Sequence, residues 1–124
     1  MTDQLAMLSE AAFAALQHAY APYSRFRVGA ALAAQGHLFV GCNVENAAFG
    51  STLCAERGAV MRAVVHGVRV FDELVIATEG DRPVPPCGAC RQVLAEFAPQ
   101  LRITSVTRGE LDARRVVSPA LRGQ

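Results

Sequence analysis

Residues 52–59 read T-L-C-A-E-R-G-A and begin an Ala- and Val-rich run that continues to His66. The apolar residues of this run crowd one side at helical spacing, and Gly67 is a natural stop, so the run predicts a mostly buried helix from about Leu53 to His66. Residues 86–97 read P-C-G-A-C-R-Q-V-L-A-E-F, and the run A-C-R-Q-V-L-A-E-F-A at residues 89–98 predicts another helix, which is closed by Pro99. Both expected helices begin at cysteines, and the elements around them determine the fold.

The remaining segments alternate with these two helices. An Ala-rich stretch from about Leu5 to Ala19 has apolar residues at three- and four-residue steps and predicts an amphipathic helix. Compact apolar runs predict four strands, at residues 26–34, 38–44, 74–78 and 101–107. The first two form an antiparallel hairpin across Gln35-Gly36-His37. This order predicts an α/β fold, a three-layer α/β/α sandwich whose later strands are parallel and whose ligands bind where the crossover helices start.

Length and composition suit one compact domain over residues 1–124. The chain has 52% hydrophobic and 19% charged residues, which excludes intrinsic disorder. Its 12 basic residues balance 11 acidic ones, so nothing favours binding to a nucleic-acid polymer. The start lacks a basic segment before an apolar run, and no uncharged stretch approaches the length of about 18 residues that a membrane span needs. The protein is therefore expected to be cytoplasmic, without membrane contact.

Four cysteines, at positions 42, 54, 87 and 90, are better interpreted in a cytosolic chain as metal ligands, catalytic thiols or buried apolar groups than as disulfides. Cys87 and Cys90 are three residues apart at a helix start, where both thiols can lie on one side of the first turn. C-x-x-C alone also serves redox chemistry and structural zinc. Together with C-A-E at residues 54–56, it matches the pattern of zinc deaminases with cysteine as the first ligand.

A hydrolytic zinc site needs three protein ligands and an open position for water, and Cys54, Cys87 and Cys90 supply three ligands. Glu56 stands two residues after the first of them, where a carboxylate can take a proton from water and pass it to the substrate. The simpler interpretation of Glu56 is an acid that complements the dipole of its helix.

Three thiolates on Zn²⁺ leave a formal charge of minus one, which weakens the metal as a Lewis acid unless positive charge offsets it. The partial positive charges of helix N-termini offset part of this negative charge, and an arginine that donates a hydrogen bond to sulfur offsets a further part. Arg57 is favoured for that bond over Arg91, which is equally well explained as a solvent-exposed residue. Cys42 is interpreted as a buried inert thiol, with a fourth zinc ligand as the alternative.

The chain resembles the small homotetrameric cytidine deaminases in the two cysteine segments and in two more, A-P-Y-S-R-F-R-V-G-A-A-L at residues 21–32 and G-C-N-V-E-N-A at residues 41–47. The resemblance covers the chain from about Leu5 to Pro119. It implies zinc-dependent hydrolysis of cytidine and 2′-deoxycytidine to uridine and 2′-deoxyuridine with release of ammonia, in pyrimidine salvage. It also implies one Zn²⁺ per chain, a mixed five-stranded sheet, and a homotetramer with active sites at subunit contacts.

Motif by motif, the resemblance assigns roles to single residues. It implies that Cys54, Cys87 and Cys90 bind zinc, that Glu56 shuttles protons, that Asn43 and Glu45 hold the sugar hydroxyls, and that Phe26 helps line the base pocket. Chemistry supports the sugar assignment, because residues two apart on an extended segment share a face, and an amide beside a carboxylate suits a hydroxyl that donates and accepts. The alternative is a pair of polar residues on a solvated strand end.

Two positions depart from the family pattern. The family has a C-terminal L-L-P-x-x-F segment that brings an aromatic ring onto the base in a neighbouring subunit, whereas residues 117–122 here read V-S-P-A-L-R. The stacking contact is therefore either missing or replaced by Leu121 or the Arg122 guanidinium, and loss of the ring would weaken binding by roughly 1 kcal/mol. Phe49 stands where relatives often have tyrosine.

Two other functions compete with this one. A deaminase of another aminopyrimidine compound, such as a blasticidin-type nucleoside, would use the same metal chemistry, but Asn43 and Glu45 argue against a substrate without ribose. A non-catalytic module with a closed zinc site would need Cys42 as the fourth ligand and would leave Glu56 without a role. The spacing 42, 54, 87, 90 also lacks a second C-x-x-C pair.

Overall fold

The structure, a computed structural model, describes residues 2–80, 87–108 and 114–117. Its helices are α1 (Asp3–Leu16), the short 3-10 helix η1 (Phe49–Ser51), α2 (Ala55–Val65) and α3 (Gly88–Phe97). Its strands are β1 (Val28–Ala34), β2 (His37–Cys42), β3 (Glu73–Thr78), β4 (Arg102–Thr107) and β5 (Arg114–Val117). Within the described ranges, none of these helices has the length and apolar character needed to cross a membrane.

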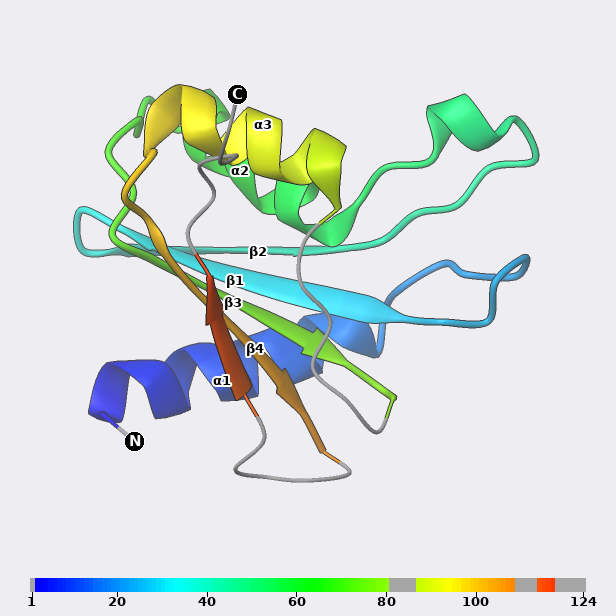
Figure 1. The fold of residues 1–124 in the computed structure, drawn as a ribbon, viewed down its shortest axis with the longest axis horizontal. Helices are drawn as coiled ribbons and strands as arrows, with labels where there is room; N and C mark the ends of the chain where they lie inside the picture. Colours follow the sequence, from blue (N-terminus) through cyan, green and yellow to red (C-terminus); the bar gives the residue numbers. More distant parts are fainter. Residues whose placement is uncertain (1, 81–86, 109–113, 118–124) are drawn as a thin grey trace.

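The strands form one sheet in the order β2-β1-β3-β4-β5 (Figure 1). β1 is antiparallel to both β2 and β3, β3 and β4 are parallel, and β5 is antiparallel to β4. The parallel pair is the one connected through α3, as expected for a crossover connection. The prediction of an α/β fold with a mixed sheet is therefore confirmed. The short strand β5 was not predicted from local pattern.

The β1–β2 hairpin turns through two residues. Gln35 and Gly36 have φ angles of 50° and 81°, the left-handed conformation that a two-residue hairpin turn requires at both central positions. His37 pairs with Ala34 and belongs to β2, so the turn is one residue shorter than predicted. The Asp72 carboxylate accepts a hydrogen bond from the Gln35 N–H at 2.8 Å and ties the turn to the segment before β3.

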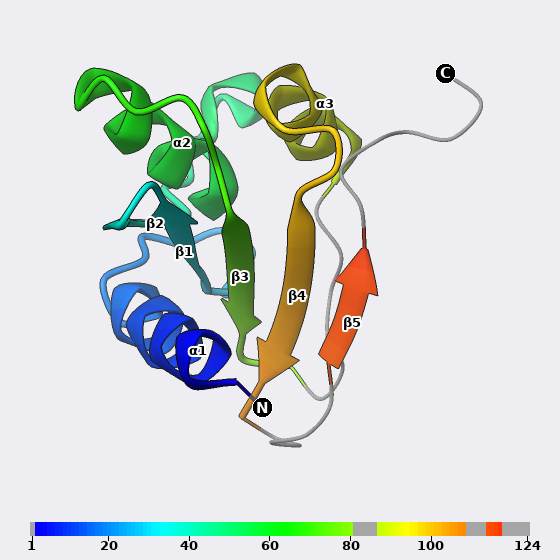
Figure 2. The same cartoon turned by 90° about the vertical axis from the view of Figure 1, so that its left-hand side faces the viewer.

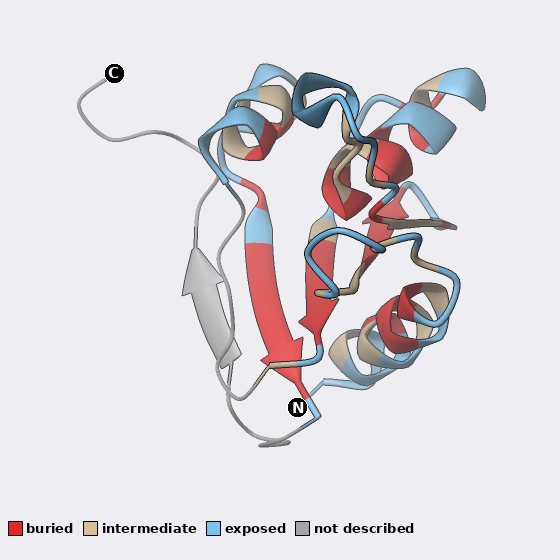
Figure 3. Cartoon of the chain, turned by 90° about the vertical axis from the view of Figure 1, so that its right-hand side faces the viewer, coloured by how far each residue is buried: buried red, intermediate tan, exposed pale blue. Residues whose placement is uncertain are grey.

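Helices cover both faces of the sheet. α1 lies on one face, and α2 and α3 lie on the other (Figure 2). Successive strand residues therefore enter different cores: Leu74 and Ile76 of β3 join the apolar cluster that contains α2 and α3 residues, while Val75 and Ala77 join the cluster that contains α1 residues. β1, β3 and β4 are buried along nearly their whole length, as are the inner sides of the helices, whereas β2 is mostly half-buried or exposed (Figure 3).

The start of α2 touches the sheet at backbone distance. A Cβ added to Gly41, in β2, would lie 2.4 Å from the carbonyl oxygen of Ala55 and 2.7 Å from the nitrogen of Ala59. No side chain is accommodated at such distances, so glycine lets the first turn of α2 rest directly on β2. This contact sets the height of Cys54 and Glu56 above the sheet.

Candidate metal centre and active site

Three thiols meet where α2 and α3 begin. Cys54 is the N-cap residue of α2, Cys87 is the N-cap residue of α3, and Cys90 lies in the first turn of α3. Their sulfur atoms lie within 4.8 Å of one another, close enough to hold one metal ion. Tetrahedral zinc with Zn–S bonds of about 2.3 Å separates its sulfur ligands by about 3.8 Å, which small side-chain movements achieve here. Cys42, at the end of β2, is not part of this group.

Hydrogen-bond donors surround the sulfur atoms. The backbone N–H of Cys90 donates to Cys87 Sγ at 3.5 Å, and Arg57 Nη2 donates to Cys54 Sγ at 3.3 Å. The same Arg57 nitrogen donates to the Thr52 carbonyl oxygen at 3.2 Å, which holds the guanidinium in place. Hydrogen bonds from the Cys90 thiol and from Arg57 lower the pKa of Cys54 to about 5. The Cys54 sulfur and burial raise the pKa of Cys90, so Cys54 is the first of the two to ionise.

Glu56 lies in the first turn of α2 with 5% of its surface exposed. Burial raises the pKa of its carboxyl to about 7, and the charge on Cys54 adds to the rise. An acid that merely complements a helix dipole would stay in water and remain ionised. The Glu56 carboxyl instead lines a cavity beside the thiols, with a pKa that suits proton exchange near neutral pH.

The cavity has a volume of about 200 Å³ and lies between the sheet and the starts of α2 and α3. It is lined by Val28, Asn43, Thr52, Cys54, Ala55, Glu56, Ile76, Thr78 and Cys87. The position agrees with the expectation that ligands bind where crossover helices begin. Sequence reasoning did not single out Thr52 or Thr78, because Thr52 opens the T-L-C-A-E-R-G-A segment without an assigned role and Thr78 belongs to no motif.

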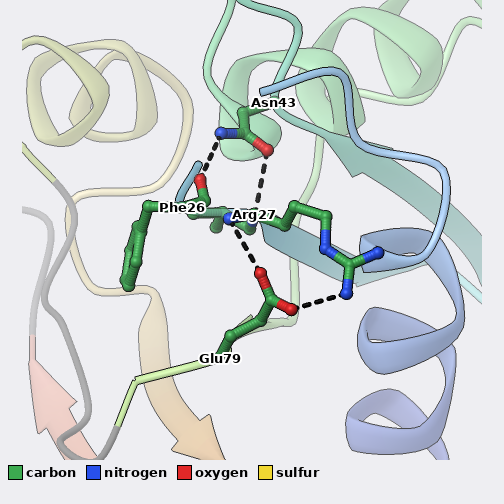
Figure 4. Close-up of polar contacts among 5 residues, drawn as sticks. Phe26, Arg27, Asn43 and Glu79 are labelled. Atoms are coloured by element: carbon green, nitrogen blue, oxygen red, sulfur yellow. Dashed lines mark hydrogen bonds and ion pairs between the residues drawn. The ribbon is translucent and has the colours of Figure 1, made fainter. Parts of the chain in front are cut away.

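Asn43 lines this cavity and also fastens the start of β1. Its side chain is 8% exposed, its Oδ1 accepts a hydrogen bond from the Val28 N–H at 2.9 Å, and its Nδ2 donates to the Phe26 carbonyl oxygen at 2.9 Å (Figure 4). A primary amide has two N–H donors and two acceptor lone pairs. One donor and one lone pair of Asn43 are therefore left for a ligand.

Glu45 binds the segment that precedes β1. Its carboxylate accepts hydrogen bonds from the backbone N–H groups of Tyr23 and Ser24, at 3.0 Å each, and from the Ser24 hydroxyl. The bonds from Ser24, followed by the bond from Tyr23, lower the pKa of Glu45. Among the described residues, Glu45 is not one of those that line the cavity. In this structure Asn43 and Glu45 thus both bind residues 23–28.

The segment around Phe26 has a further anchor that sequence reasoning missed. The Phe26 N–H donates to Ser24 Oγ at 3.0 Å, and the next residue, Arg27, binds Glu79 (Figure 4). The Arg27 N–H donates to Glu79 Oε1 at 3.2 Å, and Arg27 Nη2 donates to Glu79 Oε2 at 2.5 Å. The pairing of β1 with β3 brings Glu79 here, and no local signal in the sequence reveals it.

The two positions that depart from the family pattern lie apart from the cavity or outside the described residues. Phe49 lies in η1 and is 90% exposed. η1 belongs to an excursion of the chain between β2 and α2 that projects beyond the sheet (Figure 1). Leu121 and Arg122, the expected replacements for the C-terminal aromatic ring, lie outside the described residues.

Comparison with known proteins places these features in a family. The family model described as "Cytidine and deoxycytidylate deaminase zinc-binding region" matches residues 2–106. The cytidine deaminase of Sporosarcina psychrophila is 55% identical over 84 residues, which are 67% of this chain and 62% of that protein. The cytidine deaminase of Halalkalibacterium halodurans is 50% identical over 94 residues, 75% of this chain and 71% of that protein. The matched region thus spans about two thirds of these relatives' length.

Solved structures agree over more of the chain. The crystal structure of cytidine deaminase from Burkholderia pseudomallei has a TM-score of 0.86 and 45% identity, and the match covers 96% of this chain and 94% of that chain. Cytidine deaminase from Mycobacterium tuberculosis has a TM-score of 0.76 and 41% identity, with 83% and 85% covered. The predicted cofactor is confirmed, because the family model is a zinc-binding region and the three thiols form a group able to hold a metal ion. The chain therefore belongs to the zinc-binding cytidine and deoxycytidylate deaminase family.

Proposed function

We propose that this chain hydrolyses cytidine and 2′-deoxycytidine to uridine and 2′-deoxyuridine and releases ammonia. The observation that carries the proposal is one cavity that brings the buried Glu56 carboxyl together with the thiols of Cys54 and Cys87. The family and the names of the relatives support the same reaction. The activity fits a role in pyrimidine salvage.

In this proposal Cys54, Cys87 and Cys90 hold the metal. Zinc bound there supplies Lewis acidity, which brings the pKa of water into the neutral range. The N-termini of α2 and α3 and the Arg57 guanidinium stabilise the negative charge of the three thiolates. Arg57 thus acts through Cys54. Its hydrogen bond draws electron density away from the sulfur, so the thiolate neutralises less of the positive charge of the metal.

Glu56 moves the protons. Its carboxylate accepts a proton from the attacking water, whose oxygen bonds to C4 of the pyrimidine, and donates that proton to ring nitrogen N3. A second proton from the same hydroxyl oxygen passes through Glu56 to the amino group, the C4–N bond breaks, and ammonia leaves. Water and cytidine are consumed and uridine and ammonia are formed. Burial raises the pKa of the Glu56 carboxyl above its ordinary value, which favours a group that accepts a proton in one step and donates it in the next.

Phe26, Asn43 and Glu45 are the proposed contacts of the nucleoside. Asn43 lines the cavity and keeps a donor and an acceptor for a sugar hydroxyl. Glu45 has one lone-pair position beyond its three present hydrogen bonds, and Phe26 lies on the segment that both residues bind. This assignment requires the ribose to lie beside residues 23–28.

The domain organisation, assembly and location of the protein are further parts of this proposal. We propose one three-layer deaminase domain over residues 1–124, with five strands, that assembles as a cytoplasmic homotetramer with active sites at subunit contacts. The exposure of Tyr20, Tyr23, Val44 and Phe49, on segments next to the site, supports burial against another copy. Light scattering of the purified protein tests this, and a monomer at micromolar concentration contradicts it.

The two competing functions have less support. The group of thiols able to hold a metal does not include Cys42, and a closed four-thiolate site needs it. Absorption spectra of the cobalt-substituted protein distinguish four thiolate ligands from three. A blasticidin-type substrate is tested by comparing turnover of cytidine, cytosine, deoxycytidine monophosphate and blasticidin.

The deciding experiment measures the loss of cytidine ultraviolet absorbance in the presence of purified protein whose zinc content is known. Glu56→Gln is the matched control, because it keeps the shape of the side chain and should keep the zinc. We expect rapid conversion by the wild type and a kcat lower by about 10²–10⁴-fold in Glu56→Gln. No conversion by a wild-type chain that carries zinc would refute the proposed substrate. Full activity in zinc-loaded Glu56→Gln would refute the role of Glu56.

A further inference from the structure

One polar group in the cavity has no role in the site described above. Thr78 is the last residue of β3, is 1% exposed, and lines the cavity together with Glu56 and Cys87. Its Oγ1 is buried without a hydrogen-bond partner in the part of the chain that the structure describes. A buried hydroxyl that has lost water without gaining a partner lowers the stability of a protein. The fold alone therefore gives no reason for a hydroxyl at this position.

The direction of the Thr78 side chain follows from the strand. Leu74 and Ile76, four and two residues earlier, pack in the core with α2 and α3, and side chains two apart on a strand share a face. Val28, which pairs with Thr78 across β1 and β3, also lines the cavity. The hydroxyl thus stands on the face of the sheet that carries the thiols and Glu56.

A second cavity, of about 220 Å³, borders Thr78 from the α1 side of the sheet. Its charged groups are already engaged: Glu79 binds Arg27, and the Arg108 guanidinium lies 4.0 Å from the centre of the Phe13 ring. The strand alternation also directs Thr78 away from that side. The cavity with the thiols is therefore the one in which the hydroxyl finds its partner.

We propose that the Thr78 hydroxyl is a binding contact for the pyrimidine ring of the nucleoside. This inference rests on the proposed function, which requires the ring to enter this cavity and reach Glu56. A pyrimidine carries polar atoms along its edge, and a hydroxyl both donates and accepts, so the bound ring supplies the partner that Thr78 lacks in the free protein. Thr78 is then a specificity-determining residue. Its unpaired hydroxyl lowers the stability of the free protein, and the hydrogen bond to the bound ring offsets that loss.

The test compares Thr78→Val with the wild type, since valine has the shape of threonine without the hydroxyl. Calorimetric titration with uridine measures binding without turnover, and steady-state kinetics with cytidine give KM and kcat. We expect Thr78→Val to weaken uridine binding and to raise KM by about two- to twelvefold, the usual effect of one lost hydrogen bond. We expect kcat to stay within about twofold, because the contact is present in the bound ground state as well.

Melting temperature of the ligand-free protein is the second readout. Because Thr78→Val removes an unpaired buried hydroxyl, its melting temperature without ligand should equal or exceed that of the wild type. The increase in melting temperature caused by uridine should become smaller. A threonine with a purely structural role would show the reverse, a lower melting temperature and unchanged uridine affinity. That result would overturn the proposal.

Two matched variants complete the design. Thr78→Ser keeps a hydroxyl and should bind uridine nearly as well as the wild type. Thr104→Val makes the same change at a buried threonine of β4 that pairs with Val75, on the α1 side of the sheet, and should leave KM unchanged. Equal losses in Thr78→Ser and Thr78→Val, or the same loss in Thr104→Val, would overturn the role of the hydroxyl.

The wild-type measurements keep the two proposals separate. If the zinc-loaded wild type neither deaminates cytidine nor binds uridine, the proposed function fails and this inference falls with it. If the wild type is active and Thr78→Val keeps wild-type affinity for uridine, only the inference about Thr78 is overturned.

Discussion

The Glu79 carboxylate accepts hydrogen bonds from two donors of Arg27, the backbone N–H at 3.2 Å and the guanidinium at 2.5 Å. Arg27 lies between Phe26 and Val28, whose backbone groups both bind the Asn43 amide. Two side chains from distant parts of the chain thus hold three consecutive residues at the start of β1 (Figure 4). Since Val28 lines the cavity, Glu79 helps set the position of that wall.

Glu79→Ala removes both acceptors, and we expect KM for cytidine to rise about threefold while kcat stays within about twofold, because the wall loses its fixed position. The side chains of Arg27 and Glu79 are 36% and 37% exposed, so the ion pair adds little to global stability. Glu79→Gln keeps an acceptor for the Arg27 N–H and should have an intermediate KM. A Glu79→Ala variant with wild-type KM would contradict this role.

Glu45 should make stability depend on pH at the acid end. Hydrogen bonds from Ser24 and Tyr23 lower its pKa in the folded protein, so the unfolded chain binds the proton more tightly. The stabilisation is therefore complete above the unfolded-state pKa of about 4.3 and is lost as pH falls through the lower folded-state pKa. Melting temperatures of the wild type and Glu45→Gln should differ at neutral pH and converge in acid. A difference that does not change with pH would count against the prediction.

Cys87→Ala should lose the metal, and the starts of α2 and α3 should then no longer be linked through a shared ion. We expect zinc content to fall from about one per chain to near zero, and the melting temperature to fall to that of wild-type protein treated with a chelator. Cys42→Ala is the matched control, since Cys42 lies outside the group of thiols, and should keep its zinc. Elemental analysis and thermal melting check both. Stoichiometric zinc in Cys87→Ala would show that the assigned ligand set is wrong.

Gly41→Ala tests the contact between β2 and α2. The added methyl carbon would lie 2.4 Å from the Ala55 carbonyl oxygen, so α2 must move away from the sheet. We expect a loss of about 1–3 kcal/mol in the free energy of unfolding, together with weaker zinc binding, because the moving turn carries Cys54. Gly50→Ala, where an added Cβ meets nothing within 4 Å, is the control. Wild-type stability in Gly41→Ala would be inconsistent with this contact.

The grouping of the thiols followed from the sequence because it depends on short-range geometry. Cys87 and Cys90 share one helical turn, and Cys54 and Glu56 share another, so a spacing of two or three residues fixes each pair. Only the meeting of the two turns is a long-range event, and the expected α/β order predicted it through the positions of the crossover helices.

The positions of Thr78 and Glu79 depend on a different kind of information. Both follow from the register in which Val28 pairs with Thr78, and a shift of one residue would exchange their faces. The sequence contains no local signal for that register. The same reason explains why Asn43 and Glu45 were expected to share a face but not to bind residues 23–28.

The contact at Gly41 also limits how this metal centre can be moved to another protein. A designer who grafts three cysteines and a glutamate onto a new host scaffold reproduces the ligands but not their placement, because that placement comes from a helix resting on bare backbone. A suitable host must offer a strand that lacks a side chain under the first turn of the helix. The transferable unit is therefore the strand and the helix together.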